Sequence, residues 1–311
     1  MNETFHSRFA SQLREFVRMK RTFGHIYIGA AKELRSFDRF AVSTPGDLPA
    51  LLTGWLNLHG GSKPCTLGHR FSTVRQFCLF RRRHDPGAFV PERSWAPRTT
   101  AAPFLPHIFS TDELRRVIDG TVTIKRSART RRCLRLLVIV LYCTGLRAGE
   151  ALGLKWSDVD LEQNLFKVGP SKGRTRWVPF RADVARLLRA WHAEESPEPD
   201  TLVFAQDNGH RRRVGPTSQS FRFLFRRLGL KPRRGRVGPR LHDLRHTFAV
   251  HCLQRWYRQQ RDPQRMLPWL SAYLGHRNLV GTEHYLHATP ELLATASGRL
   301  QRLLRFSPLP T

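Results

Sequence analysis

The 311-residue sequence lacks the features of membrane, secreted and disulfide-bonded proteins. Its longest apolar run, Leu136 to Cys143, is far shorter than the roughly 20 residues that a membrane span needs. Met1 to Lys20 has no apolar block of the kind found in signal peptides. The five cysteines are odd in number and widely spaced, with no CxxC pair for zinc. We therefore expect a cytosolic protein with free thiols and no membrane partner.

Motifs for nucleotide-driven and zinc-dependent chemistry are also missing. The chain has no GxxxxGK[ST] loop, no GxGxxG after a strand and no HExxH. His242 and His246 lie at positions i and i+4, which would suit zinc, but no third ligand accompanies them. The sequence thus predicts neither a metal nor another cofactor.

Acidic residues and lysines are scarce. Asp and Glu number 24 against 53 Lys and Arg, which gives a formal net charge of +29, and only eight of the basic residues are lysines. Arginine makes planar, bidentate contacts with phosphate, and a large positive excess binds nucleic acid in a salt-dependent way. A GC-rich genome would also produce an arginine bias, but the charge excess remains. Because 40% of the residues are hydrophobic, we expect a globular protein that binds a polyanion.

Apolar periodicity predicts four short helices in residues 1–84, which would form a small bundle. They cover Phe5 to Val17, Ala30 to Val42, Leu48 to Leu58 and Leu67 to Phe80. From residue 85 to 107 the periodicity fails and five prolines accumulate, so we expect an extended linker there.

A second domain is expected over residues 108–289. Ser110 to Glu113 has the form of a helix capping box. Val159 to Val168 and Arg176 to Phe180 are predicted to be short strands, joined by a turn at Gly169 to Gly173. Helices dominate the remainder, so the predicted fold is mainly α with a small antiparallel β-sheet (α+β).

The sequence of residues 290–311 predicts a C-terminal helix, with Thr289 as its N-cap and Pro290 at its first position. An apolar stripe on this helix must be buried, either against the rest of its own chain or against a neighbouring copy. The stripe consists of Leu292, Leu293, Leu300, Leu303 and Leu304.

Separated motifs rich in basic residues end in a tyrosine. In chain order they are Thr144-Gly-Leu-Arg147-Ala-Gly-Glu150, Lys172 in the predicted hairpin turn, His242-Asp-Leu-Arg245, Leu274-Gly-His276 and Tyr285. This combination resembles the tyrosine recombinase (phage integrase) family. The resemblance rests on five separate matches in the right order and covers about residues 107 to 290.

The resemblance implies a role for each matched residue. Six residues would form the catalytic set, and Glu150 would buttress the first arginine. The set comprises two phosphate-clamping arginines, the hairpin lysine, two active-site histidines and the nucleophile: Arg147, Arg245, Lys172, His242, His276 and Tyr285.

The chemistry of DNA cleavage supports these roles. Attack on a phosphodiester spreads negative charge over the non-bridging oxygens, which two guanidinium groups can match with paired hydrogen bonds. A tyrosine hydroxyl has a pKa near 10, so the attack needs a proton acceptor, for which His242 is the best candidate. Lys172 could protonate the leaving 5′ oxygen, and His276 would donate a hydrogen bond to the phosphate. A phosphotyrosine linkage keeps the energy of the broken bond, so no metal or ATP is required.

Other residues leave alternatives open. Tyr142, Tyr257 and Tyr273 are rival nucleophiles, although Tyr142 and Tyr273 fall in apolar stretches that favour a place in the core. Two arginine clusters are expected to contact the DNA backbone, with a solvated surface as the alternative. These clusters are Arg211, Arg212 and Arg213, and Arg233, Arg234 and Arg236.

The resemblance implies a site-specific recombinase or integrase that acts on double-stranded DNA as a homotetramer, alone or with sister recombinases. Residues 1–84 would be the DNA-clamping domain. The segment between Arg245 and His276 is longer than is usual, with polar residues from Arg255 to Arg265, and resembles transposon-encoded recombinases. A type IB topoisomerase and a non-catalytic DNA-binding accessory factor are the alternatives. Retention of all six catalytic residue types argues against the accessory factor.

Overall fold

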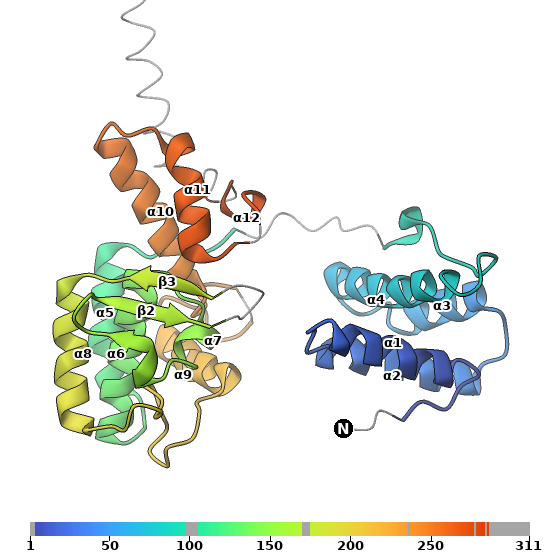
Figure 1. Cartoon of the computed structure of the whole chain (residues 1–311), viewed down its shortest axis with the longest axis horizontal. Coiled ribbons are helices and arrows are strands. Elements are labelled where there is room, and N and C mark those ends of the chain that lie inside the picture. The colour runs from blue at the N-terminus through green and yellow to red at the C-terminus, as the bar shows by residue number, and fades with distance from the viewer. Residues whose placement is uncertain are drawn as a thin grey trace, which may run out of the picture. The chain divides into compact units, whose positions relative to one another are not determined.

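The computed structural model describes residues 4–97, 105–169, 175–235, 237–276, 278–283 and 285. The chain forms two compact units, Met1–Pro103 and Phe104–Thr311, and each has its own hydrophobic core (Figure 1). Among the described residues, no helix is both long and apolar enough to cross a bilayer.

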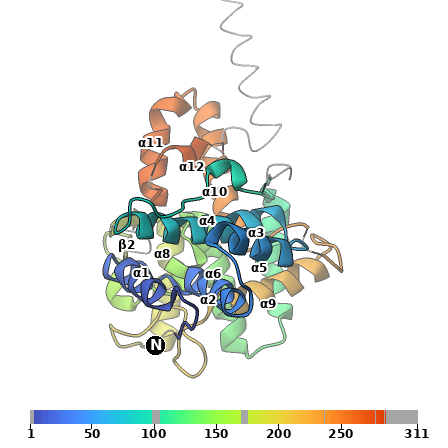
Figure 2. The same ribbon diagram turned by 90° about the vertical axis from the view of Figure 1, so that its right-hand side faces the viewer.

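The first unit is a helical bundle (Figure 2). Its helices are α1 (Ala10–Thr22), α2 (Ile28–Ser43), α3 (Leu48–Leu58) and α4 (Pro64–Arg82). Aromatic side chains dominate the core and include Phe16, Phe37, Trp55 and Phe77. Helix α3 starts where the Asp47 carboxylate accepts a hydrogen bond from the backbone N–H of Ala50 (3.0 Å).

The first helix begins later than the apolar pattern predicts. Phe5 and Phe9 are buried in the core of the bundle but lie before α1. The buried carboxylate of Asp38 accepts hydrogen bonds from the backbone of His6 (2.8 Å) and Ser7 (3.0 Å) and from the Ser7 hydroxyl (2.5 Å). These bonds tie the preceding segment to α2 in place of a further helical turn.

The first half of the expected linker packs onto the bundle. Phe89, Val90 and Ala96 contact the helical core. The Arg75 guanidinium on α4 donates a hydrogen bond to the carbonyl of Pro91 (2.9 Å). Prolines separate these apolar residues and prevent helical spacing, so periodicity could not reveal that they are buried.

The second unit is mainly helical with one small antiparallel sheet, which confirms the predicted fold class. Helix α5 (Thr111–Gly120) opens with the predicted capping box, because Ser110 and Glu113 each accept a hydrogen bond from the other's backbone N–H (3.2 and 2.9 Å). The other α-helices are α6 (Ala128–Thr144), α7 (Ala148–Ala151), α8 (Ala182–Glu195), α9 (Val214–Arg227), α10 (Asp243–Arg258), α11 (Pro263–Leu274) and α12 (Val280–Glu283).

The sheet has the order β1-β2-β3, with both strand pairs antiparallel. Its strands are β1 (Val159–Asp160), β2 (Leu165–Val168) and β3 (Arg176–Pro179). The run from Val159 to Val168, predicted as one strand, therefore folds back on itself. The Asp160 carboxylate accepts hydrogen bonds from the backbone of Glu162 (3.0 Å) and Gln163 (2.7 Å), and Asn164 has a φ of 56°. Such Asx turns stop a strand even within an apolar run.

The long segment between Arg245 and His276 forms most of α10 and α11, which pack together on a separate core (Figure 1). The polar residues 255–265 cover the end of α10, the connection and the first turn of α11. Asp262 caps α11 by accepting a hydrogen bond from the backbone N–H of Gln264 (3.0 Å). At 1.5 Å per residue, the end of α10 lies about 20 Å from Arg245, so the added length falls at the far end of the helix.

Candidate active site

Four chain segments bring together the predicted site residues that the structure describes. The segments are the starts of α7 and α10, the turn after α11 and the residue two positions after α12, and they supply Arg147, His242 with Arg245, His276 and Tyr285. Arg245 lies at their centre: its charge lowers the pKa of both predicted histidines and opposes the rise in the pKa of Tyr285.

Two glycines in the left-handed region turn the chain into the site. Gly145 (φ +61°) ends α6, and Gly275 (φ +68°) ends α11. A Cβ on Gly145 would lie 2.5 Å from the ring of Phe248, and a Cβ on Gly275 would lie 2.8 Å from the guanidinium of Arg176. Only glycine satisfies both the backbone angle and the space, and each turn is followed within two residues by a predicted catalytic side chain.

Glu150 holds the first arginine in place. Its carboxylate side chain, 1% exposed, accepts hydrogen bonds from Nη1 of Arg147 (2.8 Å) and from the Arg147 backbone N–H (3.0 Å). Nη2 of Arg147 donates to the Gly275 carbonyl (3.2 Å). Arg176 on β3 supplies the second positive charge, with Nη1 and Nη2 3.2 and 2.8 Å from the two Glu150 oxygens. One buried carboxylate thus lies between two guanidinium groups, and Arg147 stays 24% exposed.

Arg245 is buried at 2% exposure and joins the two glycine turns. Its Nη1 donates to the Gly145 carbonyl (2.8 Å), and its Nη2 donates to the Leu274 carbonyl (2.7 Å). Burial, together with the nearby charge of Arg147, lowers the pKa of Arg245 to about 10. The guanidinium therefore remains protonated at neutral pH and presents a fixed positive charge beside Tyr285.

Three histidines of the site are neutral at pH 7. Burial lowers the pKa of His246 and of His276 to about 4, with further lowering by His242 and Arg245 respectively. Burial and the charge of Arg245 also lower the pKa of His242, whose ring packs against His246. A neutral imidazole has one nitrogen that can accept a proton and one that donates, so each ring can take part in proton transfer.

Tyr285 is 3% exposed and packs between two of these rings. The ring centroids of Tyr285 and His246 are 5.5 Å apart, and those of Tyr285 and His276 are 6.1 Å apart. Burial raises the pKa of Tyr285, while the charges of Arg245 and Arg147 oppose that rise. The phenol is thus a protonated group beside a guanidinium, and it would need a proton acceptor in order to attack.

The histidine pair that suggested zinc packs ring against ring. The rings of His242 and His246 meet edge to face, with centroids 4.9 Å apart and planes at 89°. Nε2 of His246 lies 3.9 Å from the carboxylate of Asp243. In the part of the chain that the structure describes, no three His, Cys, Asp or Glu side chains gather as a metal site would require.

Two side chains of the site escaped the sequence analysis. Thr282, fully buried, places its Oγ1 2.7 Å from Nδ1 of His276 and so orients that ring. The sequence pattern identifies Arg176 only as the start of a strand. Its place in that strand is nevertheless a clue to its burial, because Arg176 and Val178 alternate with exposed Trp177 and so share the inward face of β3. A buried arginine needs a carboxylate partner, which here is Glu150.

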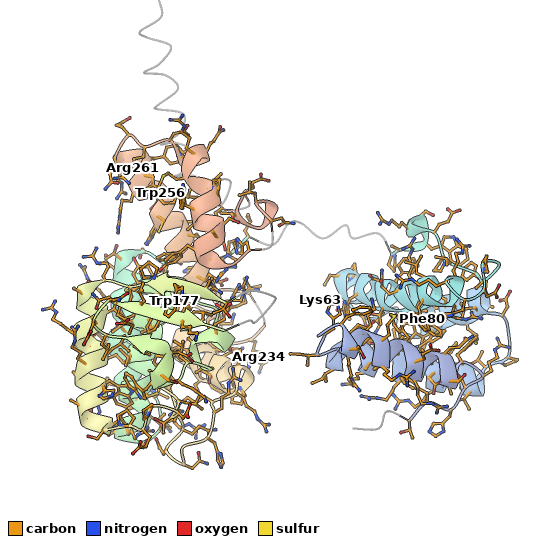
Figure 3. The ribbon with its side chains drawn as sticks, viewed as in Figure 1. Lys63, Phe80, Trp177, Arg234, Trp256 and Arg261 are labelled. Carbon is orange, nitrogen blue, oxygen red and sulfur yellow. The ribbon has the colours of Figure 1, made fainter. Side chains whose placement is uncertain are left out.

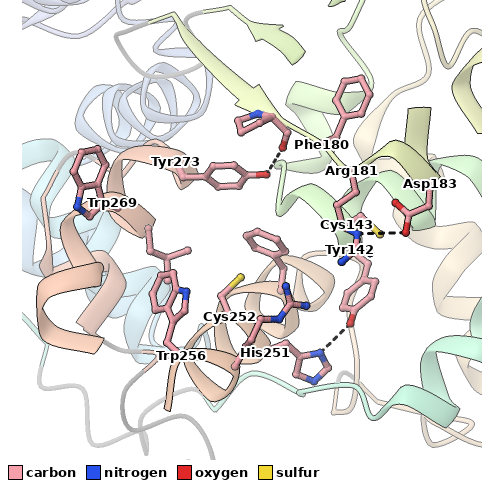
Figure 4. A pocket seen from close by; sticks show the side chains of 14 residues that line it. Tyr142, Cys143, Phe180, Arg181, Asp183, His251, Cys252, Trp256, Trp269 and Tyr273 are labelled. Atoms are coloured by element: carbon pink, nitrogen blue, oxygen red, sulfur yellow. Dashed lines mark hydrogen bonds and ion pairs between the residues drawn. The ribbon is translucent and has the colours of Figure 1, made fainter. Parts of the chain in front are cut away.

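Two rival tyrosines lie around a different cavity, of about 580 Å³, between α6, α10 and α11 (Figure 4). The Tyr142 hydroxyl is 3.0 Å from Nδ1 of His251, and the Tyr273 hydroxyl donates to the Pro179 carbonyl (2.9 Å). Burial raises the pKa of both phenols. Tyr257 packs against the core of α10 and α11. The Tyr273 backbone carbonyl accepts a hydrogen bond from Arg176 (2.9 Å). In the described residues none of these three phenol groups hydrogen bonds to Arg147 or Arg245, whereas the charges of both arginines act on Tyr285.

The predicted DNA-contacting arginines have different surroundings. Arg211 donates to the carbonyls of Leu152 (3.2 Å) and Gly149 (2.9 Å), so it braces α7 behind Arg147. Arg212 donates to the hydroxyl of Thr130 (3.0 Å), while Arg213 is exposed. Arg233 and Arg234 are exposed in the loop after α9, where Figure 3 labels Arg234. Arg236, Lys172 with most of its predicted turn, and residues 286–311 lie outside the described residues.

Comparison with known proteins places this arrangement among DNA recombinases. The sequence model of the phage integrase family matches residues 108–291. The integrase/recombinase y4rB of Sinorhizobium fredii is 32% identical over 314 residues, which cover 95% of this chain and 98% of y4rB.

Solved structures share the fold. A XerH site-specific recombinase bound to its palindromic difH substrate, in a post-cleavage complex, has a TM-score of 0.67 at 22% identity and covers 94% of this chain and 84% of its own. The integrase of transposon Tn1549 in complex with transposon right-end DNA has a TM-score of 0.66 at 16% identity, over 94% of this chain and 99% of its own.

Proposed function

Because the chain belongs to the phage integrase family of tyrosine recombinases, it is an enzyme of site-specific DNA recombination, and we propose that it cuts and rejoins DNA through a 3′-phosphotyrosine bond at Tyr285. One observation carries the proposal: the buried Tyr285 packs against the rings of His246 and His276 beside the charge of Arg245, and Arg147, held by Glu150, supplies a second guanidinium there. A phenol at this place would meet a phosphate held by both guanidinium groups.

The two arginines supply the stabilisation of the transition state. As the Tyr285 oxygen bonds to phosphorus, negative charge grows on the non-bridging oxygens, and preorganised guanidinium donors lower the barrier. Arg245 is fixed by two carbonyls and Arg147 by Glu150 and a third carbonyl. Little reorganisation is then needed when charge develops, which supports their assignment as the phosphate clamp.

Proton transfer completes the step. His242 takes the Tyr285 proton, a role supported by its neutral state and by its place one helical turn from Arg245. The 5′ oxygen leaves as a hydroxyl after receiving a proton, for which we assign Lys172 from the sequence. His276, held by Thr282 through Nδ1, donates from its other nitrogen to the phosphate. The phosphodiester becomes a phosphotyrosyl diester, so a 5′ hydroxyl can reverse the reaction without metal or ATP.

Full strand exchange sets the stoichiometry. Two DNA sites have four strands at the exchange points, and each cut uses one tyrosine, so four protomers are needed. We assign the first unit, with the helices of residues 1–84, to clamping DNA, and the tail of residues 290–311 to docking on a neighbouring protomer. The working complex is then a homotetramer on nucleoid DNA, with or without sister recombinases. The match to a transposon integrase supports a mobile element as its source.

A type IB topoisomerase is the alternative enzyme, since it would use the same chemistry on one duplex. The apolar stripe of the tail favours assembly instead, because a solitary enzyme has no partner to receive it. Relaxation of supercoiled DNA that lacks a target site, at protein concentrations where no multimer forms, would support the topoisomerase.

The test is covalent trapping on a nicked DNA substrate, with EDTA in excess and no ATP. The wild-type protein should accumulate a protein–DNA adduct at a 3′ phosphate. Tyr285→Phe should form none while binding the same duplex, since only the reacting oxygen is lost. Tyr257→Phe is the matched control and should form the adduct. An adduct with Tyr285→Phe, or a strict requirement for magnesium in the cutting step, would contradict the proposal.

A further inference from the structure

Arg176 on β3 contacts several parts of the site at once. Its Nη1 and Nη2 contact the two oxygens of Glu150 (3.2 and 2.8 Å), and its Nε donates to the carbonyl of Tyr273 (2.9 Å). The side chain is 14% exposed. All three nitrogens thus hydrogen bond within the protein, which suits a side chain that holds other groups in place.

The contact with Glu150 fixes the charge balance around Arg147. Glu150 is almost fully buried and receives hydrogen bonds from both arginines. The bidentate contact with Arg176 holds the carboxylate plane, and Arg147 is then anchored through its own Nη1 and backbone N–H. Without Arg176, the carboxylate would lose a bidentate contact and the charge that balances it on the side away from Arg147.

Arg176 also contacts the turn that precedes His276. The Arg176 guanidinium packs against Gly275, where an added Cβ would lie between 2.8 and 3.0 Å from its atoms. The Gly275 carbonyl accepts a hydrogen bond from Arg147, and His276 is the next residue. The same side chain therefore sets the carboxylate that holds Arg147 and the turn that delivers His276.

We propose that Arg176 is a positioning residue of the cleavage reaction, which acts on the scissile phosphate through Arg147 and His276 without touching DNA. The inference rests on the proposed function, since it assumes that Arg147 clamps the phosphate. It predicts that Arg176 contributes to the rate of the chemical step and only weakly to DNA affinity.

The experiment measures single-turnover adduct formation and DNA affinity for Arg176→Ala and Arg176→Lys. Arg176→Ala should slow cleavage about 10–100-fold, the range found when outer-shell partners of functional ligands are removed. Arg176→Lys keeps a charge near Glu150 but cannot also reach the Tyr273 carbonyl, so it should be slowed less. Arg181→Ala is the matched control: Arg181 lies two residues beyond β3, is 70% exposed, pairs with Asp183, and its loss should leave cleavage unchanged.

A double-mutant cycle separates positioning from a general effect on folding. If Arg176 acts through Arg147, Arg176→Ala should slow a chain that already carries Arg147→Ala far less than it slows the wild type. A methylphosphonate at the scissile position, which removes the phosphate charge, should relieve both single variants. Relief for Arg147→Ala alone, or equal slowing in both backgrounds, would overturn the inference.

The proposed function is tested separately by the wild-type adduct in the same assay. If the wild type forms no adduct, the proposed function fails. If the wild type forms it and Arg176→Ala cleaves at the wild-type rate, only the inference fails. Arg176→Lys and the methylphosphonate substrate keep the test decisive even where Arg176→Ala folds poorly.

Discussion

Single residues in this site are organised around buried charge. Among the described residues, the Glu150 carboxylate pairs with both Arg147 and Arg176. The Arg245 guanidinium is held by two backbone carbonyls, so its positive charge is only partly compensated. An anionic phosphate would complete that balance, so the site should favour an anion.

The depressed histidine pKa values predict how stability depends on pH. His246 and His276 have folded-state pKa values of about 4 against 6.5 in the unfolded chain, so between these values the unfolded state binds more protons. Their contribution is fully present above pH 6.5 and is lost as the pH falls toward 4. Urea unfolding at pH 7.5, 6 and 5 should show a decline, at most about 1.4 kcal/mol per pH unit for each histidine.

The control for this prediction is His246→Gln, which keeps a polar side chain but cannot take up a proton. Its stability should fall less steeply with decreasing pH than that of the wild type. An identical slope in both proteins would mean that His246 has the same pKa in the folded and unfolded chain, so that burial does not change its protonation.

Candidate residues were easier to predict than their partners. Arg147, Arg245 and Tyr285 could be singled out as candidates because the motifs follow a fixed order along the chain, and the structure brings them close together. Arg176 and Thr282 could not be named, because their roles depend on contacts made across 26 and 6 positions of sequence, which no local pattern encodes. Sequence could suggest only that an inward-facing arginine on a strand needs an acidic partner.

At the scale of elements, helix signals with a local cause predicted the structure well. The capping box at Ser110 and the helix from Leu48 to Leu58 appear as expected, because both depend on neighbouring residues. The predicted strand from Val159 to Val168 was wrong, because Asp160 forms a turn within it. The segment around Phe89 packs on the bundle, although its prolines suggested a linker. That segment is ordered by contacts with the bundle, which the local sequence does not encode.

The turn that ends α11 gives a prediction at this scale. Gly275→Ala should destabilise the second unit by more than the roughly 1–2 kcal/mol of a left-handed alanine, because its Cβ also meets Arg176. Cleavage should slow as well, since the turn delivers His276. Thermal unfolding and single-turnover cleavage measure the two effects.

Gly229→Ala serves as the matched substitution. Gly229 has a φ of +72° and nothing within 4 Å of an added Cβ, so it reports the backbone penalty alone. If the two variants lose the same stability and cleave equally well, Arg176 can move aside for the added Cβ at no cost, and the turn at Gly275 does not control the site.

At the scale of the whole molecule, the net charge of +29 and the apolar stripe of the tail would serve two different kinds of binding. The charge would attract the DNA backbone, and the stripe would hold neighbouring protomers together. Truncation after Pro290 should leave binding to a single site nearly unchanged but abolish cooperative binding and synapsis, as a gel-shift titration would measure. If the truncated protein is insoluble, and any soluble fraction still binds cooperatively, the tail belongs to the core of its own chain.

The burial of Tyr285 bears on how the protein behaves on chromosomal DNA outside its target sites. A strongly basic protein also binds non-target DNA, and each such contact brings phosphodiester bonds close to the protein. If Tyr285 is the nucleophile, a residue that is 3% exposed could attack such a bond only after its surroundings open. Chance contacts with DNA should then not lead to cleavage, and off-target cuts should depend on how rarely other sequences hold the site open. Cleavage would then be confined to DNA that opens the surroundings of Tyr285.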